Sequence, residues 1–349
     1  MQLDFGGGKD ISFFKEGRTG IVRLTRPKVL NALNEKMVKA LSKALHSWET
    51  DDDVLCVLIE GEGRAFCSGG DIVAAYKTGK AGKPDYHYFT EEYRLNAYIG
   101  EFPKPYIAIL DGICMGGGAG ISVHGSHRIV TENTIFSMPE SSIGFFPDVG
   151  AGEFLPRLSD NFGIYLALTG EHLKWGDCLQ TGLATHAVSQ DNLENLRQSI
   201  IEQGNPRPAL EQYALEVNYE TSAEVRILIT ECFGKPTLED CIAALQQKAG
   251  DGNNFAQSCL DKLSLRSPTS LKVIWRAMSM CKPLGLSDCL KLENRIAHHM
   301  MDNHDFYEGV RAALIDKDRT PKWQPDKLEN VTEEIVDSYF QPVDNELVI

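Results

Sequence analysis

Segments with strand-like and helix-like hydrophobic patterns alternate along the first half of the chain. A β-branched run at 21–25 and an almost wholly apolar run at 54–59 (VLCVLI) both predict strands, the second one covered on both faces. Between them, apolar residues recur at helical spacing as far as Trp48, and Asn34 is placed to cap the helix that they predict.

The same alternation continues beyond residue 80. Tyr86 to Phe102 has a helical pattern, 105–110 reads as another buried strand, and 112–125 is a glycine-rich turn that opens a helix. This order of strands and helices predicts right-handed crossovers and a largely parallel sheet, and therefore an α/β fold.

The pattern changes after about residue 193, where long helical repeats dominate. The sequence therefore predicts three parts. These are a core domain at 1–200 that carries the active site, a helical region at 201–330, and a loosely attached acidic tail at 331–349.

Composition narrows the class of protein. With 349 residues, 42% hydrophobic and 24% charged, the chain has the makeup of a globular protein with a sizeable core. A net charge of −14 argues against an extended basic face for nucleic acid or anionic membrane, although it allows a local basic pocket. No apolar run is long enough to span a bilayer. The nine scattered cysteines, without a CxxC pair, indicate reduced thiols.

Two glycine-rich segments follow predicted strands. RAFCSGGDI at 64–72 lets a ligand approach the backbone closely, although a small-Gly-Gly turn is often only a tight connection. MGGGAG at 115–120 fits either phosphate binding or an oxyanion hole. The dinucleotide fingerprint is not met in a helpful place, whereas two loops at one sheet edge could each supply a backbone donor.

Carboxylates form the second group of candidates. In SMPESSIGFFPDVGAG (137–152), Glu140 and Asp148 flank two phenylalanines, and burial there would suit acid–base or nucleophilic chemistry. Asp148 could equally cap the helix that starts near Gly150. Glu92 borders an apolar helical stripe, so that it either faces a pocket or ends the stripe at the surface.

Other reactive side chains lack a supporting pattern. His298, His299 and His304 have no metal-ligand spacing, and no GxSxG elbow is present. Cys67 and Cys114 lie beside the glycine loops, yet no histidine nearby marks either as a nucleophile, so we expect both to pack as small residues.

Taken together, the motifs resemble the crotonase (enoyl-CoA hydratase/isomerase) superfamily. The segments that carry this resemblance are RPKVLNAL at 26–33, AFCSGGDI at 65–72, GICMGGGAG at 112–120 and MPESSIGFFPDVG at 138–150. The chain is more narrowly similar to a hydrolase branch of the superfamily through EEYRLN at 91–96, SVHGSHRIVTE at 122–132, LALTGEHL at 166–173 and HDFYEGVRAALIDKDRTPKW at 304–323. The resemblance extends from about residue 11 to about residue 330.

This resemblance implies a crotonase (ClpP-like) fold, with repeated ββα units around a core sheet and a helical C-terminal region. It also implies a role for each matching position. Ser68 and Gly117 would supply the two amides of the oxyanion hole, and Lys28 would contact CoA. Glu140 would be the catalytic glutamate, and Asp148 a second catalytic and substrate-binding carboxylate. Glu92 would contact the substrate, as Gly117, Glu140 and Asp148 would.

One departure from the hydratases changes the expected reaction. Hydratases carry a first glutamate at the position that is Gly120 here, so the glutamate pair that adds water to a double bond is absent. This departure favours hydrolysis of a thioester over hydration, and the narrower resemblance to the hydrolase branch implies that the substrate is 3-hydroxyisobutyryl-CoA, in valine catabolism. Glu140 would act either as general base or as nucleophile, and the sequence does not decide between these.

The implied setting is a mitochondrial matrix enzyme whose presequence is absent from this chain, with CoA as part of the substrate and no metal or cofactor. We expect no nucleic-acid or membrane partner, while self-association stays open. Alternatives are hydrolysis of a related short 3-hydroxyacyl-CoA, an enoyl-CoA hydratase or isomerase on the same fold, and a silent CoA-binding, scaffold or RNA-binding protein. Retention of Glu140 and both glycine loops argues against a silent protein.

Overall fold

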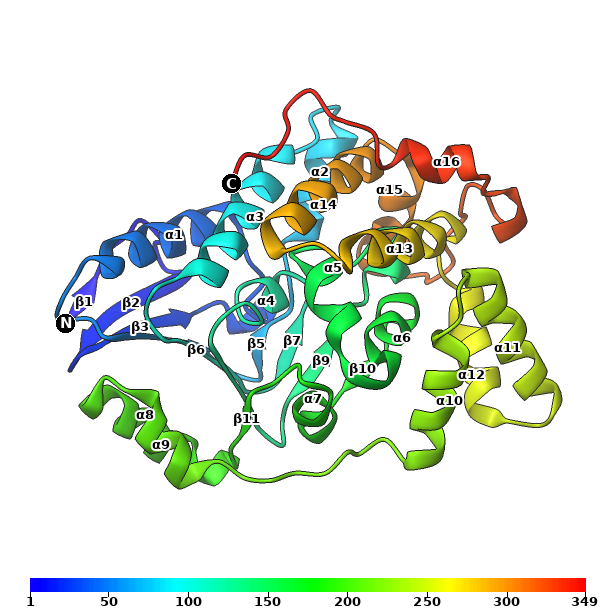
Figure 1. Cartoon of the computed structure of the whole chain (residues 1–349). Helices are drawn as coiled ribbons and strands as arrows, with labels where there is room; N and C mark the ends of the chain where they lie inside the picture. Colours follow the sequence, from blue (N-terminus) through cyan, green and yellow to red (C-terminus); the bar gives the residue numbers. More distant parts are fainter. The chain divides into compact units, whose positions relative to one another are not determined.

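The computed structural model describes all residues from Met1 to Ile349 and divides into two compact units (Figure 1). The first unit contains 1–71, 91–136 and 173–220, and the second contains 72–90, 137–172 and 221–349. The predicted limits at residues 200 and 330 therefore do not coincide with these units. Segment 137–172 belongs with the C-terminal helices, although it lies far from them in the sequence.

The first unit is built on a seven-stranded sheet with the order β1-β2-β3-β4-β6-β8-β11. Its strands are β1 (Gln2–Leu3), β2 (Ile11–Glu16), β3 (Thr19–Leu24), β4 (Cys56–Gly61), β6 (Tyr106–Leu110), β8 (His127–Val130) and β11 (His186–Ala187). The three N-terminal strands pair antiparallel, and every pair from β3 to β11 is parallel. The prediction of a largely parallel sheet is thus confirmed, with β4 starting two residues later than predicted.

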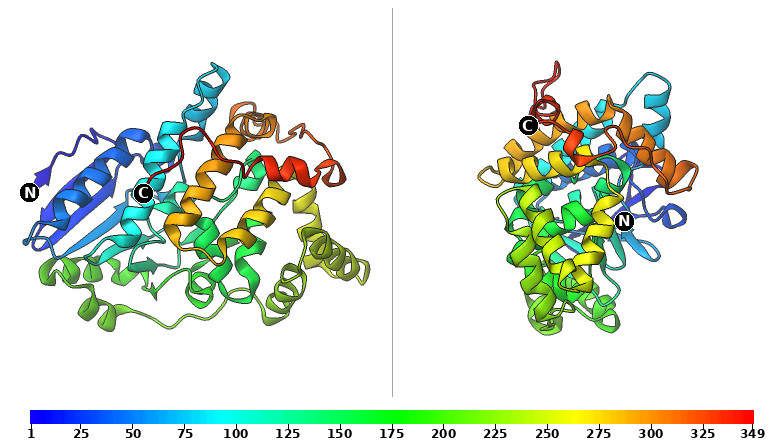
Figure 2. Two further views of the ribbon diagram at one scale, coloured as in Figure 1. Left: turned by 45° about the horizontal axis from the view of Figure 1, so that its top comes forward. Right: turned by 90° about the vertical axis from the view of Figure 1, so that its right-hand side faces the viewer.

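Helices cover both faces of this sheet, which explains why its strands are apolar on both sides. The helices of this unit are α1 (Glu35–Glu49), the part of α3 (Tyr86–Glu101) from residue 91, α4 (Gly117–Gly120), α7 (Trp175–Thr181), α8 (Gln190–Gln203) and α9 (Pro206–Tyr213). On β3, a Cβ on Gly20 would lie 2.7 Å from Trp48 of α1, whereas neighbouring Ile21 packs in a cluster with Ile200 of α8. Figures 1 and 2 show α1 on one side of the strands and α8 and α9 on the other. As predicted, Asn34 caps α1, and its side chain accepts the amide of Met37.

A smaller sheet, with the order β10-β9-β7-β5, carries the glycine loops. It consists of β5 (Ala65–Cys67), β7 (Ile113–Met115), β9 (Ile135–Ser137) and β10 (His172–Leu173). The segment 64–71, predicted as a loop, therefore contains a three-residue strand. Because β5 and β7 pair in parallel, the glycine turns that follow them leave the sheet at the same edge.

The second unit is almost entirely helical. Its helices are α2 (Ile72–Lys80), α5 (Ala151–Phe154), α6 (Phe162–Thr169), α10 (Ala223–Phe233), α11 (Leu238–Gly250), α12 (Asn254–Ser264), α13 (Pro268–Cys281), α14 (Leu286–Met301), α15 (His304–Val310) and α16 (Glu333–Ser338). Figure 2 shows α10, α11 and α12 packed together as one group of helices. Short 3₁₀ turns connect several elements, including Glu140–Ile143, and a π-helical turn at Arg311–Ile315 follows α15.

The acidic tail is packed onto this unit, contrary to the prediction that it is loosely attached. Val336 and Tyr339 are buried, and Arg276 of α13 pairs with Asp337 at 2.7 Å and also with Glu333. The sequence pattern gave a wrong prediction for the tail because its few apolar residues are widely spaced. Tertiary contacts, and not a local repeat, place them in the core.

Two further observations concern the whole chain. None of the helices combines the length and the apolar character that crossing a membrane requires. All nine cysteines are buried and unpaired, as the sequence predicted for reduced thiols.

Candidate active site

Two backbone amides of the first unit, those of Gly70 and Gly117, lie side by side without hydrogen-bond partners. Gly70 forms a parallel bridge with Leu33, in which the Leu33 amide donates to Gly69 and the Asp71 amide donates to Leu33, both at 2.8 Å. The Gly70 amide takes no part in this pairing and lies 3.2 Å from where a Cβ on Gly117 would stand. Two such donors can stabilise a developing oxyanion.

The predicted donor Ser68 is corrected by this geometry. The amide of Ser68 donates to the carbonyl of Leu30 at 2.9 Å, so it is already engaged within the protein. The intervening Gly69 has a φ of 110°, which turns the backbone so that the amides at 68 and 70 face different neighbours. We therefore assign the pair of donors to Gly70 and Gly117. The sequence offered three small residues in a row and no means of choosing among their amides.

Glu92 lies directly against Gly117. It belongs to α3, its side chain is only 2% exposed, and its Oε1 atom would stand 2.5 Å from a Cβ on Gly117. The alternative in which Glu92 ends an apolar stripe at the surface is therefore wrong. One turn further along α3, Asn96 is fully buried and neither of its amide atoms has a partner, a feature that hydrophobic periodicity did not reveal.

Lys28 is placed differently from the other predicted residues. It lies in the short 3₁₀ turn Pro27–Val29, where it is exposed and has no buried residue as a neighbour within the turn. An exposed ammonium group on a flexible stem suits contact with a phosphate at the surface.

In the second unit, Glu140 and Asp148 form a buried pair of carboxylates. Glu140 begins a 3₁₀ turn, is 8% exposed, and its Oε2 atom has no hydrogen-bond partner. Burial, and after it the negative charge of Asp148, raises the pKa of Glu140 well above its ordinary value. A carboxylate of this kind is poised to take a proton or to attack an electrophilic carbon.

Aromatic side chains supply part of the apolar surroundings of this pair. Phe145, between the two carboxylates in sequence, packs against Phe89, Phe146 and Phe306, with ring centroids 5.8, 4.9 and 5.5 Å away. All of these rings are buried. The sequence-based expectation of an apolar loop around Glu140 is therefore confirmed.

Helix α15 pins the turn that carries Glu140. A Cβ on Gly309 would lie 2.2 Å from the carbonyl carbon of Ile143, and one on Gly144 would lie 2.1 Å from the carbonyl oxygen of Asp305. Gly144 also has a φ of 68°, which favours glycine. The backbones thus touch at both places, and this contact accounts for glycine at Gly309, within the segment HDFYEGVRA.

A third carboxylate, Glu293 of α14, completes the group and was missed by sequence reasoning. Its Oε2 and Oε1 atoms accept the amides of Gly150 and Gly152 at 2.6 and 2.8 Å. The N-cap of α5 is Gly150, so these amides are satisfied by Glu293, whereas the sequence had offered Asp148 as the cap. The sequence signal that could have revealed Glu293 is the position of an acidic residue among the apolar residues of the helix that became α14.

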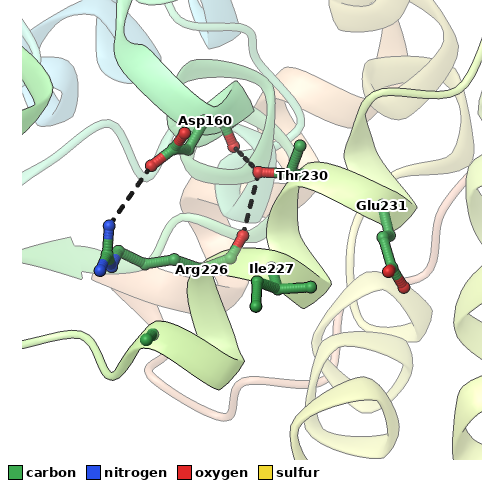
Figure 3. Close-up of a pocket in the computed structure, with 6 residues that line it drawn as sticks. Asp160, Arg226, Ile227, Thr230 and Glu231 are labelled. Carbon is green, nitrogen blue, oxygen red and sulfur yellow. Dashed lines mark hydrogen bonds and ion pairs between the residues drawn. The ribbon is translucent and has the colours of Figure 1, made fainter.

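Two other places carry no assigned chemistry. His298 is buried against Tyr86, with ring centroids 4.2 Å apart, and no group of side chains in the structure is placed to hold a metal ion. Figure 3 shows a pocket of about 310 Å³ on α10, where Arg226 pairs with Asp160 at 3.7 Å. The pocket contains none of the predicted site residues; it is lined by Asp160, Ala223, Arg226, Ile227, Thr230 and Glu231.

Comparison with known proteins defines the class. The sequence profile of the enoyl-CoA hydratase/isomerase family matches residues 19–340, and the chain belongs to this family. The chain is 43% identical to a mitochondrial 3-hydroxyisobutyryl-CoA hydrolase of Gallus gallus, with 96% of this chain and 90% of the relative covered. The corresponding protein of Homo sapiens is 42% identical over 98% of this chain and 91% of its own length.

Solved structures confirm the predicted crotonase fold. A carnitinyl-CoA dehydratase from Mycobacterium thermoresistibile superposes with a TM-score of 0.92 at 40% identity, covering 98% of this chain and 99% of that one. An enoyl-CoA hydratase from Rhodobacter sphaeroides superposes with a TM-score of 0.88 at 34% identity, covering 97% and 100%. The fold is therefore shared by proteins that carry different activities in their names.

Proposed function

We propose that the chain hydrolyses the thioester of 3-hydroxyisobutyryl-CoA to 3-hydroxyisobutyrate and CoA, a step of valine breakdown. The observation that carries the proposal is the buried carboxylate of Glu140, whose unpaired Oε2 atom and raised pKa are set beside Asp148. The name shared by relatives that are 38–44% identical over almost the whole chain supports the choice of substrate.

The amides of Gly70 and Gly117 would hold the thioester oxygen as it gains negative charge. Both donors are backbone amides that follow the paired strands β5 and β7, so they would already be in place when the charge develops. Each donor of this kind typically contributes about 10²–10³ in rate. Glu92, packed against Gly117, would form the polar end of the acyl site.

Glu140 would act on the thioester carbon by one of two routes. As a general base it would take a proton from water, whose oxygen then attacks the carbonyl carbon. As a nucleophile it would attack directly, forming an anhydride that water opens afterwards. In both routes the carbon–sulfur bond breaks, and the thiolate of CoA leaves and is protonated.

Asp148 would bind the 3-hydroxyl of the acyl group. A buried carboxylate that accepts this hydroxyl is left without that partner when the substrate lacks the group, so acyl groups without it are penalised. The exposed Lys28 would contact a phosphate of CoA. We propose no metal or redox cofactor, because hydrolysis of a thioester needs only these donors, the carboxylates and water.

Hydration of an enoyl-CoA is the second candidate, favoured by the names of the structural relatives. The family's first catalytic glutamate would stand at Gly120, which has no side chain and lies buried in α4. Addition of water to a double bond would then lack one of its two carboxylates. We therefore rank hydration below hydrolysis.

An acyl-CoA panel tests the proposal. We expect the release of free thiol from 3-hydroxyisobutyryl-CoA to be much faster than from isobutyryl-CoA, and no hydration of crotonyl-CoA. Glu140→Gln should lose nearly all hydrolysis while keeping the fold. Near-normal turnover by this variant would refute the proposal. Faster hydrolysis of another short 3-hydroxyacyl-CoA would show that this other thioester is the substrate.

The cellular setting is also a proposal. The relatives from animals are named mitochondrial, and on that basis we place this enzyme in the mitochondrial matrix. We expect neither nucleic acid nor membrane as a partner, because a net charge of −14 leaves no extended basic face. Light scattering of the purified protein would reveal whether it self-associates.

A further inference from the structure

Glu293 is a buried carboxyl group whose two oxygens are both engaged by backbone amides. It is 1% exposed, in the middle of α14, and its two carboxylate oxygens accept the amides on either side of Ala151. Gly152 approaches it so closely that a Cβ there would stand 3.1 Å from Glu293 Oε1 and 2.6 Å from Cys281 Sγ. The carboxylate is therefore clamped to the backbone just after Asp148.

The backbone at this place is strained. Val149, directly after Asp148, has a φ of 55°, which is a left-handed conformation that β-branched residues rarely adopt. Gly150 follows with a φ of 84°. At Val149 this conformation persists only because surrounding contacts hold it, whereas glycine adopts a positive φ readily.

The burial of Glu293 is itself unfavourable. Desolvation raises its pKa well above the ordinary value, the two amides oppose that shift, and the charge of Asp148 adds to it. An uncharged residue could fill the same volume without placing another acid near two existing ones. The unfavourable burial of this carboxyl group is explained if its hydrogen bonds with the amides of Gly150 and Gly152 hold the backbone in a way that an apolar side chain could not.

We infer that Glu293 is a positioning residue that holds the backbone at 150–152, directly after the strained Val149, and thereby aims the carboxylate of Asp148 at the substrate's 3-hydroxyl. This role rests on the function proposed above for Asp148. The amides of Gly150 and Gly152 both donate to this one carboxylate, so the backbone that follows Val149 cannot rotate at one of these residues alone. Glu293 itself touches no reacting atom in this scheme.

The chain contains a matched control. Glu220 accepts the amides of Gly176 and Asp177 at 3.2 and 2.8 Å at the start of α7, in the first unit. A Cβ on Gly176 would stand 2.9 Å from Glu220 Oε2, a geometry close to that of Glu293 and Gly152. Glu220 is exposed, unlike Glu293, but its replacement removes a similar pair of hydrogen bonds to backbone amides at a place that does not adjoin Asp148.

The test compares Glu293→Gln with Glu220→Gln in the full-length enzyme. Glutamine keeps the volume but can accept only one of the two amides. We expect Glu293→Gln to lower kcat/KM for 3-hydroxyisobutyryl-CoA by about tenfold or more, because small displacements of a positioning group are costly. For isobutyryl-CoA the change should stay within about twofold, so that the selectivity ratio collapses as we also expect for Asp148→Asn. Glu220→Gln should lower Tm and leave the ratio unchanged.

A second variant covers the case in which Glu293→Gln does not fold. Glu293→Asp keeps the charge and both acceptor atoms but withdraws them by one methylene, about 1.5 Å. We expect a smaller loss of the same ratio. An equal loss on both substrates, or an unchanged ratio, overturns the positioning role even if Asp148→Asn removes the preference. If the wild type hydrolyses neither substrate, the proposed function fails and this role fails with it.

Discussion

The carboxylate of Glu92 leaves no room for a side chain at Gly117, since a Cβ there would stand 2.5 Å from Glu92 Oε1. The added methyl of Gly117→Ala would also come within 3.2 Å of the Gly70 amide, the second proposed oxyanion donor. We expect kcat/KM for the acyl-CoA thioester to fall by about 10²–10³, with the melting curve still cooperative. Thiol release measures this, and Gly250→Ala, where the added carbon meets nothing within 4 Å, should behave as wild type.

Asp148 should control the pH range in which the enzyme works. Glu140 must be ionised to act as base or nucleophile, and its pKa is raised by burial and then by the charge of Asp148. Asp148→Asn removes that charge, lowers the pKa of Glu140, and so moves the acidic limb of the kcat/KM profile to lower pH. The exposed substitution Asp52→Asn should leave the limb in place. An acidic limb that stays, or that moves to higher pH, would contradict the electrostatic coupling.

Glu140 should cost stability in neutral and alkaline solution. Its pKa in the folded protein lies well above the ordinary value of 4.5, so the native state binds the proton more tightly than the unfolded chain does. The contribution of Glu140 to the free energy of unfolding is therefore fully present below about pH 4.5 and is lost as pH rises through the folded-state pKa. Glu140→Gln should raise Tm by a few degrees at pH 8, about 2–4 °C for each kcal/mol recovered, and by less near pH 5. Calorimetry at the two pH values checks this, and a lower Tm at pH 8 would be the wrong sign.

Gly309 should matter for catalysis although it lies in a different segment from the carboxylates. A methyl group at this position would meet the carbonyl carbon of Ile143 at 2.2 Å and displace the turn that begins with Glu140. We expect Gly309→Ala to reduce kcat by about tenfold or more and to lower Tm, because backbone atoms cannot move aside as a flexible side chain can. Gly285→Ala, in the same unit and with open space around the added carbon, serves as control. Unchanged kcat in Gly309→Ala would show that the turn tolerates the shift.

Much of the fold follows from local pattern. Apolar runs predicted strands β4 and β6, helical spacing predicted α1 and α3, and their order predicted a largely parallel sheet. These predictions are confirmed because burial of one or both faces of an element imposes a periodic pattern of apolar residues that is visible in the sequence. The prediction of a loosely attached tail was wrong because the buried residues of the tail, such as Val336 and Tyr339, do not recur with a helical or strand period.

Sequence patterns also singled out Glu140, Asp148 and the glycine run at 115–120, because carboxylates in apolar segments and glycine runs are unusual, and the family resemblance then implied the roles of Glu92 and Gly117. Only the tertiary structure chose Gly70 over Ser68, since which amide is left without a partner depends on the φ of Gly69 and on the carbonyl of Leu30. It alone joined Glu293 to the backbone beyond Asp148, across more than 140 residues of chain. Local patterns record which residues are buried, whereas hydrogen-bond partners and electrostatic neighbours exist only once distant segments have packed.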